Sequence, residues 1–272
     1  MAGIFWAAAA LMYFLLFSAK IQGPDGIEKR ADWYVMGTNI FEAVAYLGAA
    51  ILCFRNWRSP QIVSGRNVWL GIGLGMFSYF LGGIIFGYWE IVLRAEPIVS
   101  PADIFFVLTY VFLIWGMILA VVSRRLNLEK WQWGIVAVIA VVGLLLVWLI
   151  SNQPTAAGEE PLTGFAGTIA PILNWFYVGS DLALLVIATT LLLAFWGGRV
   201  SQSWRIIATA AFSLYIADMW FKYAASAIPN YQSGEILEVF WIFSGVLFGI
   251  GAALEYGTSL SRSRRAGGRK RA

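Results

Sequence analysis

The sequence predicts an all-α integral membrane protein with eight transmembrane helices, arranged as two four-helix repeats that share one orientation. Composition is the first observation behind this class: the 272-residue chain is 60% hydrophobic and 12% charged, whereas soluble domains average about 45–50% and about 25%. The second is that apolar stretches of about 20 residues, the length that spans a bilayer, recur along the whole chain. Together they exclude a water-soluble domain held by a single anchor.

Charged residues or clusters of Pro, Gly and Asn bound each apolar stretch and mark the helix ends. The first stretch lacks a basic segment before it and a clear cleavage site, so we interpret it as a helix and not as a signal peptide. The predicted helices cover residues 2–19, 34–54, 68–92, 102–122, 132–151, 168–196, 206–226 and 235–258.

Lys and Arg are concentrated in the loops after the second, fourth and sixth helices and in the tail SRSRRAGGRKRA. Basic residues favour the cytoplasmic side, so both termini are expected there, in a bacterial inner membrane or an internal membrane. The net charge of +4 therefore indicates topology and contact with the lipid bilayer. We expect no binding to nucleic acid.

The sequence also matches itself without gaps at an offset of 135 residues. Since each unit has an even number of helices, the units are expected to be related by a pseudo-twofold axis along the membrane normal. We predict a first repeat over 1–130, a second over 131–260 and a basic cytoplasmic tail over 261–272. The aligned pairs share acidic, aromatic or small side chains and include Asn39 with Asn174, Trp69 with Trp204, Asp103 with Glu238 and Gly116 with Gly251.

Missing residue types exclude several classes of chemistry. The chain has no histidine and one cysteine, Cys53, which removes the usual ligands of zinc and haem, the commonest general base and any disulfide within the chain. No nucleotide-binding or hydrolase motif occurs, and the glycine-rich stretch 71–75 is better explained by close packing of helices. We expect no enzyme, no metal and no cofactor, and leave a lipid or a pigment open as a ligand.

Eight polar or ionisable side chains inside the predicted spans are the candidate site residues. An ionisable group at the bilayer centre costs about 2.5–3.5 kcal/mol on insertion scales, so such groups face the bundle interior and are candidates for function. We predict that the first six below line a polar pocket in a central crevice and receive a ligand there, and that the last two also point into the bundle. They are Asn39, Glu42, Tyr46, Asn174, Tyr177, Asp181, Asp218 and Lys222.

Structural roles are the alternative for some of these residues. Asn39 and Asn174 could hydrogen-bond to each other across the pseudo-twofold axis. Asp218 and Lys222 lie four residues apart on one helical face and could form an ion pair. The same spacing resembles the Asp-x-x-x-Lys of microbial rhodopsins, but their lysine lies on the last of seven helices, whereas another helix follows here.

Ser100, Pro101 and Asp103 have the residue types of a helix start, and Glu238 has the same role near the start of the last helix. The 14 tryptophans fall into two groups. Those at predicted helix ends fit an interfacial aromatic belt and include Trp33, Trp57, Trp69, Trp131, Trp133 and Trp204. Those within spans pack in the core or stack on a flat or polyene ligand, and are Trp115, Trp175, Trp220 and Trp241.

The segment SPADIFFVLTYVFLIWGMIL, after a helix that ends FGYWEIVL, resembles the membrane-embedded N-terminal sensory modules of bacterial diguanylate cyclases. A second copy in those modules resembles residues 216–255, with Asp218 at the acid of an L/A-D-aromatic motif. The first half has Gly82 and Gly83 where an acid is expected, and no cyclase domain follows. The resemblance implies a sensory or scaffolding membrane part that stands alone.

The sequence therefore predicts a non-enzymatic polytopic bacterial inner-membrane protein, acting as a sensor or scaffold that binds a small ligand, a lipid or another membrane protein. The first alternative is an accessory or assembly subunit of a larger photosynthetic or respiratory membrane complex. The second is a transporter of small solutes, which parallel repeats make less favoured because inverted repeats are the usual basis of alternating access.

Overall fold

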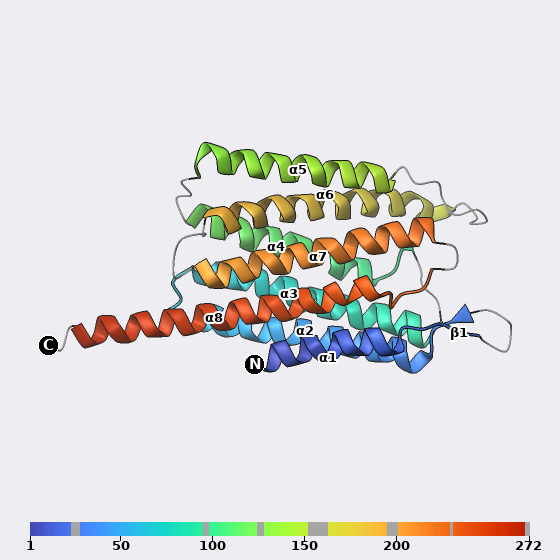
Figure 1. Cartoon of the computed structure of the whole chain (residues 1–272), viewed down its shortest axis with the longest axis horizontal. Helices are drawn as coiled ribbons and strands as arrows, with labels where there is room; N and C mark the ends of the chain where they lie inside the picture. Colours follow the sequence, from blue (N-terminus) through green and yellow to red (C-terminus); the bar gives the residue numbers. More distant parts are fainter. Residues whose placement is uncertain are drawn as a thin grey trace.

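The structure, a computed structural model, describes residues 1–22, 28–94, 98–123, 128–151, 163–194, 201–228 and 231–269. Eight α-helices run side by side along the long axis of one bundle (Figure 1). They are α1 (Ala2–Phe17), α2 (Asp32–Arg58), α3 (Arg66–Ile91), α4 (Ala102–Ser123), α5 (Lys130–Ser151), α6 (Gly164–Ala194), α7 (Ser201–Ala227) and α8 (Val239–Arg269).

Six of these helices, α2 to α6 and α8, are long and apolar enough to cross a membrane. The chain is therefore a helical, polytopic membrane protein. The other two helices differ from the six in length or polarity. At 16 residues, α1 extends about 24 Å, less than the roughly 30 Å of a hydrocarbon core, whereas α7 has 27 residues but includes Arg205, Asp218 and Lys222.

The helices pack in a connected arrangement with α1 at one edge of the bundle and α5 at the opposite edge (Figure 1). Helix α3 packs extensively against α4, and α7 packs extensively against α8. Helix α2 packs on α3 and α8, and α4 packs on α6. The largest core cluster lies where α2, α3, α4, α6, α7 and α8 meet, and Figure 1 shows both chain ends at the same end of the bundle.

Glycine explains how α3 and α4 approach each other so closely. A Cβ atom on Gly71 would lie 2.7 Å from the Gly116 Cα, and one on Gly116 would lie 2.8 Å from the Ile72 backbone nitrogen. Because these neighbours are backbone atoms, they have no rotamer through which to move away. This contact confirms that the glycine-rich stretch 71–75 serves helix packing.

Several local expectations need correction. A short hairpin of β1 (Ile21–Gln22) and β2 (Glu28–Lys29) joins α1 to α2 and was not predicted. The chain from 261 to 269, predicted as a tail, continues α8 as helix, and residues 270–272 lie outside the described part. Trp69 and Trp204, expected at the membrane interface, are buried against each other with ring centroids 6.0 Å apart.

Candidate functional site

The structure places five of the eight candidate residues in two separate polar clusters, and Asn174, Tyr177 and Lys222 belong to neither. One involves α4, α6, α7 and α8 and contains Asp181 and Asp218. The other lies between α2 and α3 and contains Asn39, Glu42 and Tyr46. The predicted single pocket lined by residues of both halves is therefore not what the described residues form.

The first cluster is organised by Tyr110, whose side chain is buried. Its hydroxyl lies 2.8 Å from Asp181 Oδ1 and 2.8 Å from Asp218 Oδ2. The indole N–H of Trp241 donates to Asp218 Oδ1, also at 2.8 Å. Three helices, α4, α6 and α7, are thus joined through one hydroxyl group.

The number of protons in this cluster follows from its geometry. A tyrosine hydroxyl has a single proton to donate, and an ionised carboxylate can only accept. The Tyr110 hydroxyl can therefore donate to Asp181 or to Asp218 but not to both. For both contacts to be hydrogen bonds, one carboxyl group must be protonated and donate to the phenolic oxygen. A cluster in which both contacts are hydrogen bonds therefore retains one proton on its carboxyl groups.

The predicted ion pair between Asp218 and Lys222 is not formed. Lys222 Nζ donates instead to the backbone oxygen of Asn174 at 3.4 Å, and no ion pair within 4.0 Å joins it to Asp218 among the residues that the structure describes. Asp218 is occupied by Tyr110 and Trp241. The i, i+4 spacing placed the two side chains on one face, but better-directed donors on other helices hold the carboxylate.

Tyr177 is close to this cluster but bonds to the start of α4. Its hydroxyl donates to Asp103 Oδ1 at 2.7 Å, while Asp103 Oδ2 accepts from the Ser100 backbone N–H and Ser100 Oγ accepts from the Ala102 N–H. The predicted helix start at Ser100 is thereby confirmed, and Glu238 has a matching capping role with Glu235. Tyr177 links α6 to the capped end of α4.

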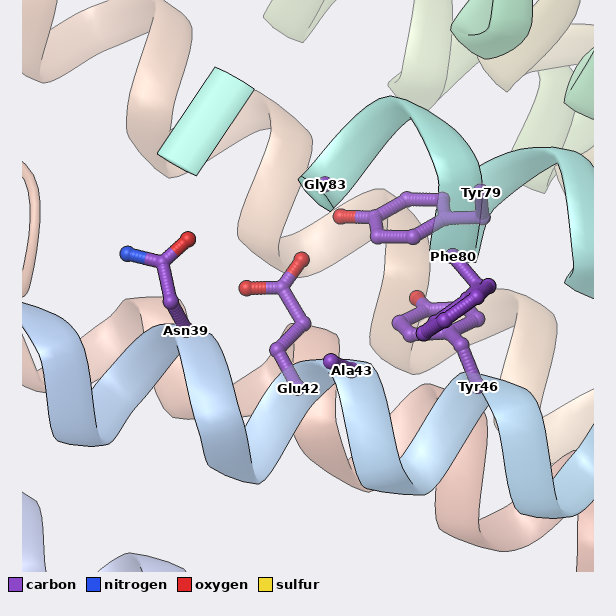
Figure 2. A pocket seen from close by; sticks show the side chains of 7 residues that line it. All are labelled: Asn39, Glu42, Ala43, Tyr46, Tyr79, Phe80 and Gly83. Atoms are coloured by element: carbon purple, nitrogen blue, oxygen red, sulfur yellow. The ribbon is translucent and has the colours of Figure 1, made fainter. Parts of the chain in front are cut away.

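The second cluster surrounds a small cavity between α2 and α3 (Figure 2). Its volume is about 10 Å³, which is room for about one water-sized group. Figure 2 shows the Tyr79 hydroxyl directed towards the Glu42 carboxyl. The ring of Tyr46 stacks on that of Tyr79 with centroids 3.7 Å apart. The cavity lining consists of Asn39, Glu42, Ala43, Tyr46, Tyr79, Phe80 and Gly83.

Asn39 closes one end of this cavity. Its amide nitrogen donates to Glu90 Oε2 at 2.9 Å and to the Val35 backbone oxygen at 3.0 Å. The expected hydrogen bond to Asn174 is therefore not made, because both N–H groups of Asn39 have partners within the first half. Beyond Glu90, a second and larger pocket of about 200 Å³ opens near the ends of α2 and α3.

Three residues of these clusters were missed by sequence reasoning: Tyr79, Tyr110 and Glu90 as a partner of Asn39. A tyrosine in the middle of a predicted span has a hydroxyl that needs a partner, and this signal could have identified Tyr79 and Tyr110. Among the tryptophans, Trp241 supplies a donor to Asp218, whereas Trp115 and Trp175 are exposed on the helix surface.

Among the described residues, no group of three or more His, Cys, Asp or Glu side chains is arranged to hold a metal ion. The arrangement instead offers carboxyl groups, hydroxyl groups and an indole N–H for proton holding and for binding polar or cationic groups. Comparisons of the chain with protein-family models, with curated proteins and with solved structures found no match.

Proposed function

We propose that the chain is a non-enzymatic protein of a bacterial inner membrane that acts as a sensor or scaffold, with the Tyr110 cluster as its responsive element. One observation supports this most directly: Tyr110, from the first half of the sequence, bonds to Asp181 and Asp218 of the second half. A ligand, lipid or protein that changes this contact changes how the halves pack. The likeness of residues 100–119 to membrane sensory modules agrees with this role.

The cluster has the properties of a two-state element. The Tyr110 hydroxyl has one proton and two carboxyl groups within reach, so it can donate either to Asp181 or to Asp218. A binding partner that prefers one arrangement shifts the balance by the difference in its affinity for the two states. Such rearrangements at helix interfaces are a common basis of switching.

We further propose that all eight helices cross the membrane and that both termini are cytoplasmic. Arg205, near the start of α7, is expected at the cytoplasmic interface, while Asp218 and Lys222 bond to other parts of the bundle, so neither charge requires contact with lipid. The short helix α1 packs against α2 and α8. The location of both chain ends at the same end of the bundle (Figure 1) supports an even number of crossings.

The duplication of a four-helix unit is also part of the proposal. At the offset of 135 residues, equivalent atoms make equivalent contacts. A Cβ on Gly116 would meet the Val68 backbone oxygen, and one on Gly251 would meet the backbone oxygen of Ser203. Trp69 and Trp204, which are equivalent to each other, are in direct contact. These contacts support a pseudo-twofold axis that passes between α3 and α7.

An accessory subunit of a larger photosynthetic or respiratory complex is the second candidate. It is favoured by exposed tryptophans on α5 and α6, two helices that lie at one edge of the bundle (Figure 1). The side chains of these tryptophans are between 56% and 66% exposed. Such a surface suits a neighbouring membrane protein or a pigment as well as lipid. These side chains are Trp131, Trp133, Trp148 and Trp175.

Purification in mild detergent followed by native mass spectrometry tests these functions. A sensor or scaffold is expected to retain a lipid, a small molecule or a membrane protein, and the Tyr110→Phe variant is expected to fold but lose it. Tyr215→Phe is the control, because the Tyr215 hydroxyl is buried and has no hydrogen-bond partner within the part of the chain that the structure describes. Retention by Tyr110→Phe equal to that of the unaltered protein contradicts the proposed role of the cluster.

The same preparation distinguishes the alternatives. Stoichiometric recovery with several subunits, or with coloured pigment, identifies the accessory subunit. Saturable solute uptake by proteoliposomes that contain the purified chain identifies a transporter. Either result would replace the sensor or scaffold assignment.

A further inference from the structure

The cavity at Glu42 has features of a binding site that the Tyr110 cluster does not share. It lies between α2 and α3, and its volume of about 10 Å³ limits an occupant to about the size of one water molecule. Its polar lining consists of oxygen-bearing groups, namely the Glu42 carboxyl, the Tyr46 and Tyr79 hydroxyls and the Asn39 amide (Figure 2).

An unsatisfied polar group points to an occupant. Tyr46 is 0% exposed, and its hydroxyl has no hydrogen-bond partner among the residues that the structure describes. The same holds for the buried hydroxyl of Ser244. A buried polar group without a partner costs about 1–3 kcal/mol, so native proteins normally satisfy such groups.

Charge indicates the chemical class of the occupant. Among the described residues, no basic side chain lies within 4.0 Å of the Glu42 carboxyl. A carboxylate in the bilayer interior is costly unless a positive charge or a proton compensates it. One carboxylate calls for one positive charge. The surrounding hydroxyl and amide oxygens are hard ligands of the kind that suit alkali cations.

The two halves differ in a way that creates this cavity. At the offset of 135 residues, Gly83 aligns with Asp218 and Gly87 aligns with Lys222. The second half therefore has its own ammonium group on α7, whereas α3 has two glycines and supplies neither the acid nor the amine. Space for a side chain exists at Gly83, since a Cβ there would meet no atom within 4 Å. A free cation can occupy the first half where the second half has Lys222.

A polar route leads towards the cavity from the end of the bundle opposite the two termini. The pocket of about 200 Å³ near the ends of α2 and α3 includes Glu90 in its lining, and Glu90 accepts from Asn39. Asn39 in turn lines the Glu42 cavity. The arginines of the outer pocket are neutralised by carboxylates: Arg30 pairs with Glu235 and Arg94 with Asp32, at 2.8 Å and 2.7 Å.

We propose that the cavity at Glu42 binds one alkali or ammonium cation, with Glu42, Tyr46, Tyr79 and Asn39 as its oxygen ligands and the Asn39–Glu90 contact on its access route. The site is separate from the Tyr110 cluster. It does not depend on a sensor function, and only the comparison of Gly83 and Gly87 with Asp218 and Lys222 uses the proposed duplication, so its test can fail without affecting either.

The test measures thermal unfolding of the full chain in detergent by tryptophan fluorescence. Sodium, potassium, lithium or ammonium chloride replaces choline chloride at constant ionic strength and constant pH. At least one cation is expected to raise the unfolding midpoint in a saturable way, since a ligand at 100 times its Kd raises the ratio of folded to unfolded protein about 100-fold. Isothermal titration calorimetry with the same salt should give one site per chain.

Glu42→Gln should abolish the cation effect, and Tyr46→Phe should weaken it. The matched control is Glu255→Gln, because Glu255 is a buried carboxyl group of α8 that bonds to Ser203 and does not line the cavity. If Glu42→Gln fails to fold, Gly83→Ala offers an independent variant, because one methyl group from α3 takes the space of the occupant and should also remove the effect.

Three results would overturn the proposal. The first is an unfolding midpoint of the unaltered protein that does not respond to any of the four cations. The second is a response that persists in Glu42→Gln or in Gly83→Ala. The third is a dependence on pH alone, which would identify the occupant as a proton. In each case the Glu42 cavity is not a site for an alkali or ammonium cation.

Discussion

Replacing Tyr110 with phenylalanine removes one hydroxyl group and should lower the stability of the whole bundle. That hydroxyl makes two contacts of 2.8 Å, with Asp181 and with Asp218. A hydrogen bond between neutral groups contributes about 0.5–1.5 kcal/mol, and one to a charged group about 1.5–3 kcal/mol. Since Asp181 is 2% exposed, water cannot readily replace the lost partner. We expect a loss of about 3 kcal/mol.

For a chain of this size, about 3 kcal/mol corresponds to a decrease in the unfolding midpoint of roughly 6–12 °C. Tryptophan fluorescence in detergent measures this midpoint, and circular dichroism checks that the helices remain. Tyr215→Phe should not lower the midpoint, because its buried hydroxyl has no hydrogen-bond partner to lose among the described residues. Equal effects of the two substitutions would refute the reasoning that the Tyr110 hydroxyl connects the two carboxyl groups.

Three further predictions concern packing, charge and topology. Gly116→Ala should destabilise the protein by about 1–3 kcal/mol, because its Cβ would overlap the α3 backbone. Gly48→Ala is the control: its Cβ would have no atom within 4 Å, so it should be neutral or stabilising by up to about 1 kcal/mol. The unfolding midpoints of the two variants are compared. Asp218→Leu should destabilise more than Lys222→Met in the same assay, since Asp218 makes two polar contacts of 2.8 Å and Lys222 donates one bond of 3.4 Å. Comparable losses would favour a direct ion pair. A fluorescent reporter fused after Ala272 should be active in the cytoplasm, and activity of a periplasmic reporter at that position would contradict an even number of membrane crossings.

The helices could be predicted from the sequence because the bilayer sets a minimum length and demands apolar composition. The side of each helix that is buried in the bundle could not be predicted in the same way. In a membrane, lipid and protein interior are both apolar, so the buried side of a helix has no strong hydrophobic contrast with the exposed side. Trp69 and Trp204 illustrate this limit: their positions near helix ends fit the interface, yet both are buried against each other.

The polar residues were easier to identify than their partners. Sequence position showed that Glu42, Asp181 and Asp218 lie in apolar surroundings, which predicts an interior location. The partner of each group depends on contacts between helices, as when Tyr110 on α4 reaches Asp181 on α6. The i, i+4 rule describes neighbours on one helix only, and for Lys222 it predicted a pairing that the bundle does not make.

Helix α8 connects two distant parts of the molecule. Trp241, which bonds to Asp218, lies near its start, and the helix continues without interruption to Arg269, about 42 Å further at 1.5 Å per residue. Figure 1 shows it projecting beyond the other helices. Because an α-helix resists twisting and compression, a small rotation or axial shift at Trp241 is transmitted as a rigid displacement. The projecting segment can act as a lever arm that reports movements made deep inside the bundle.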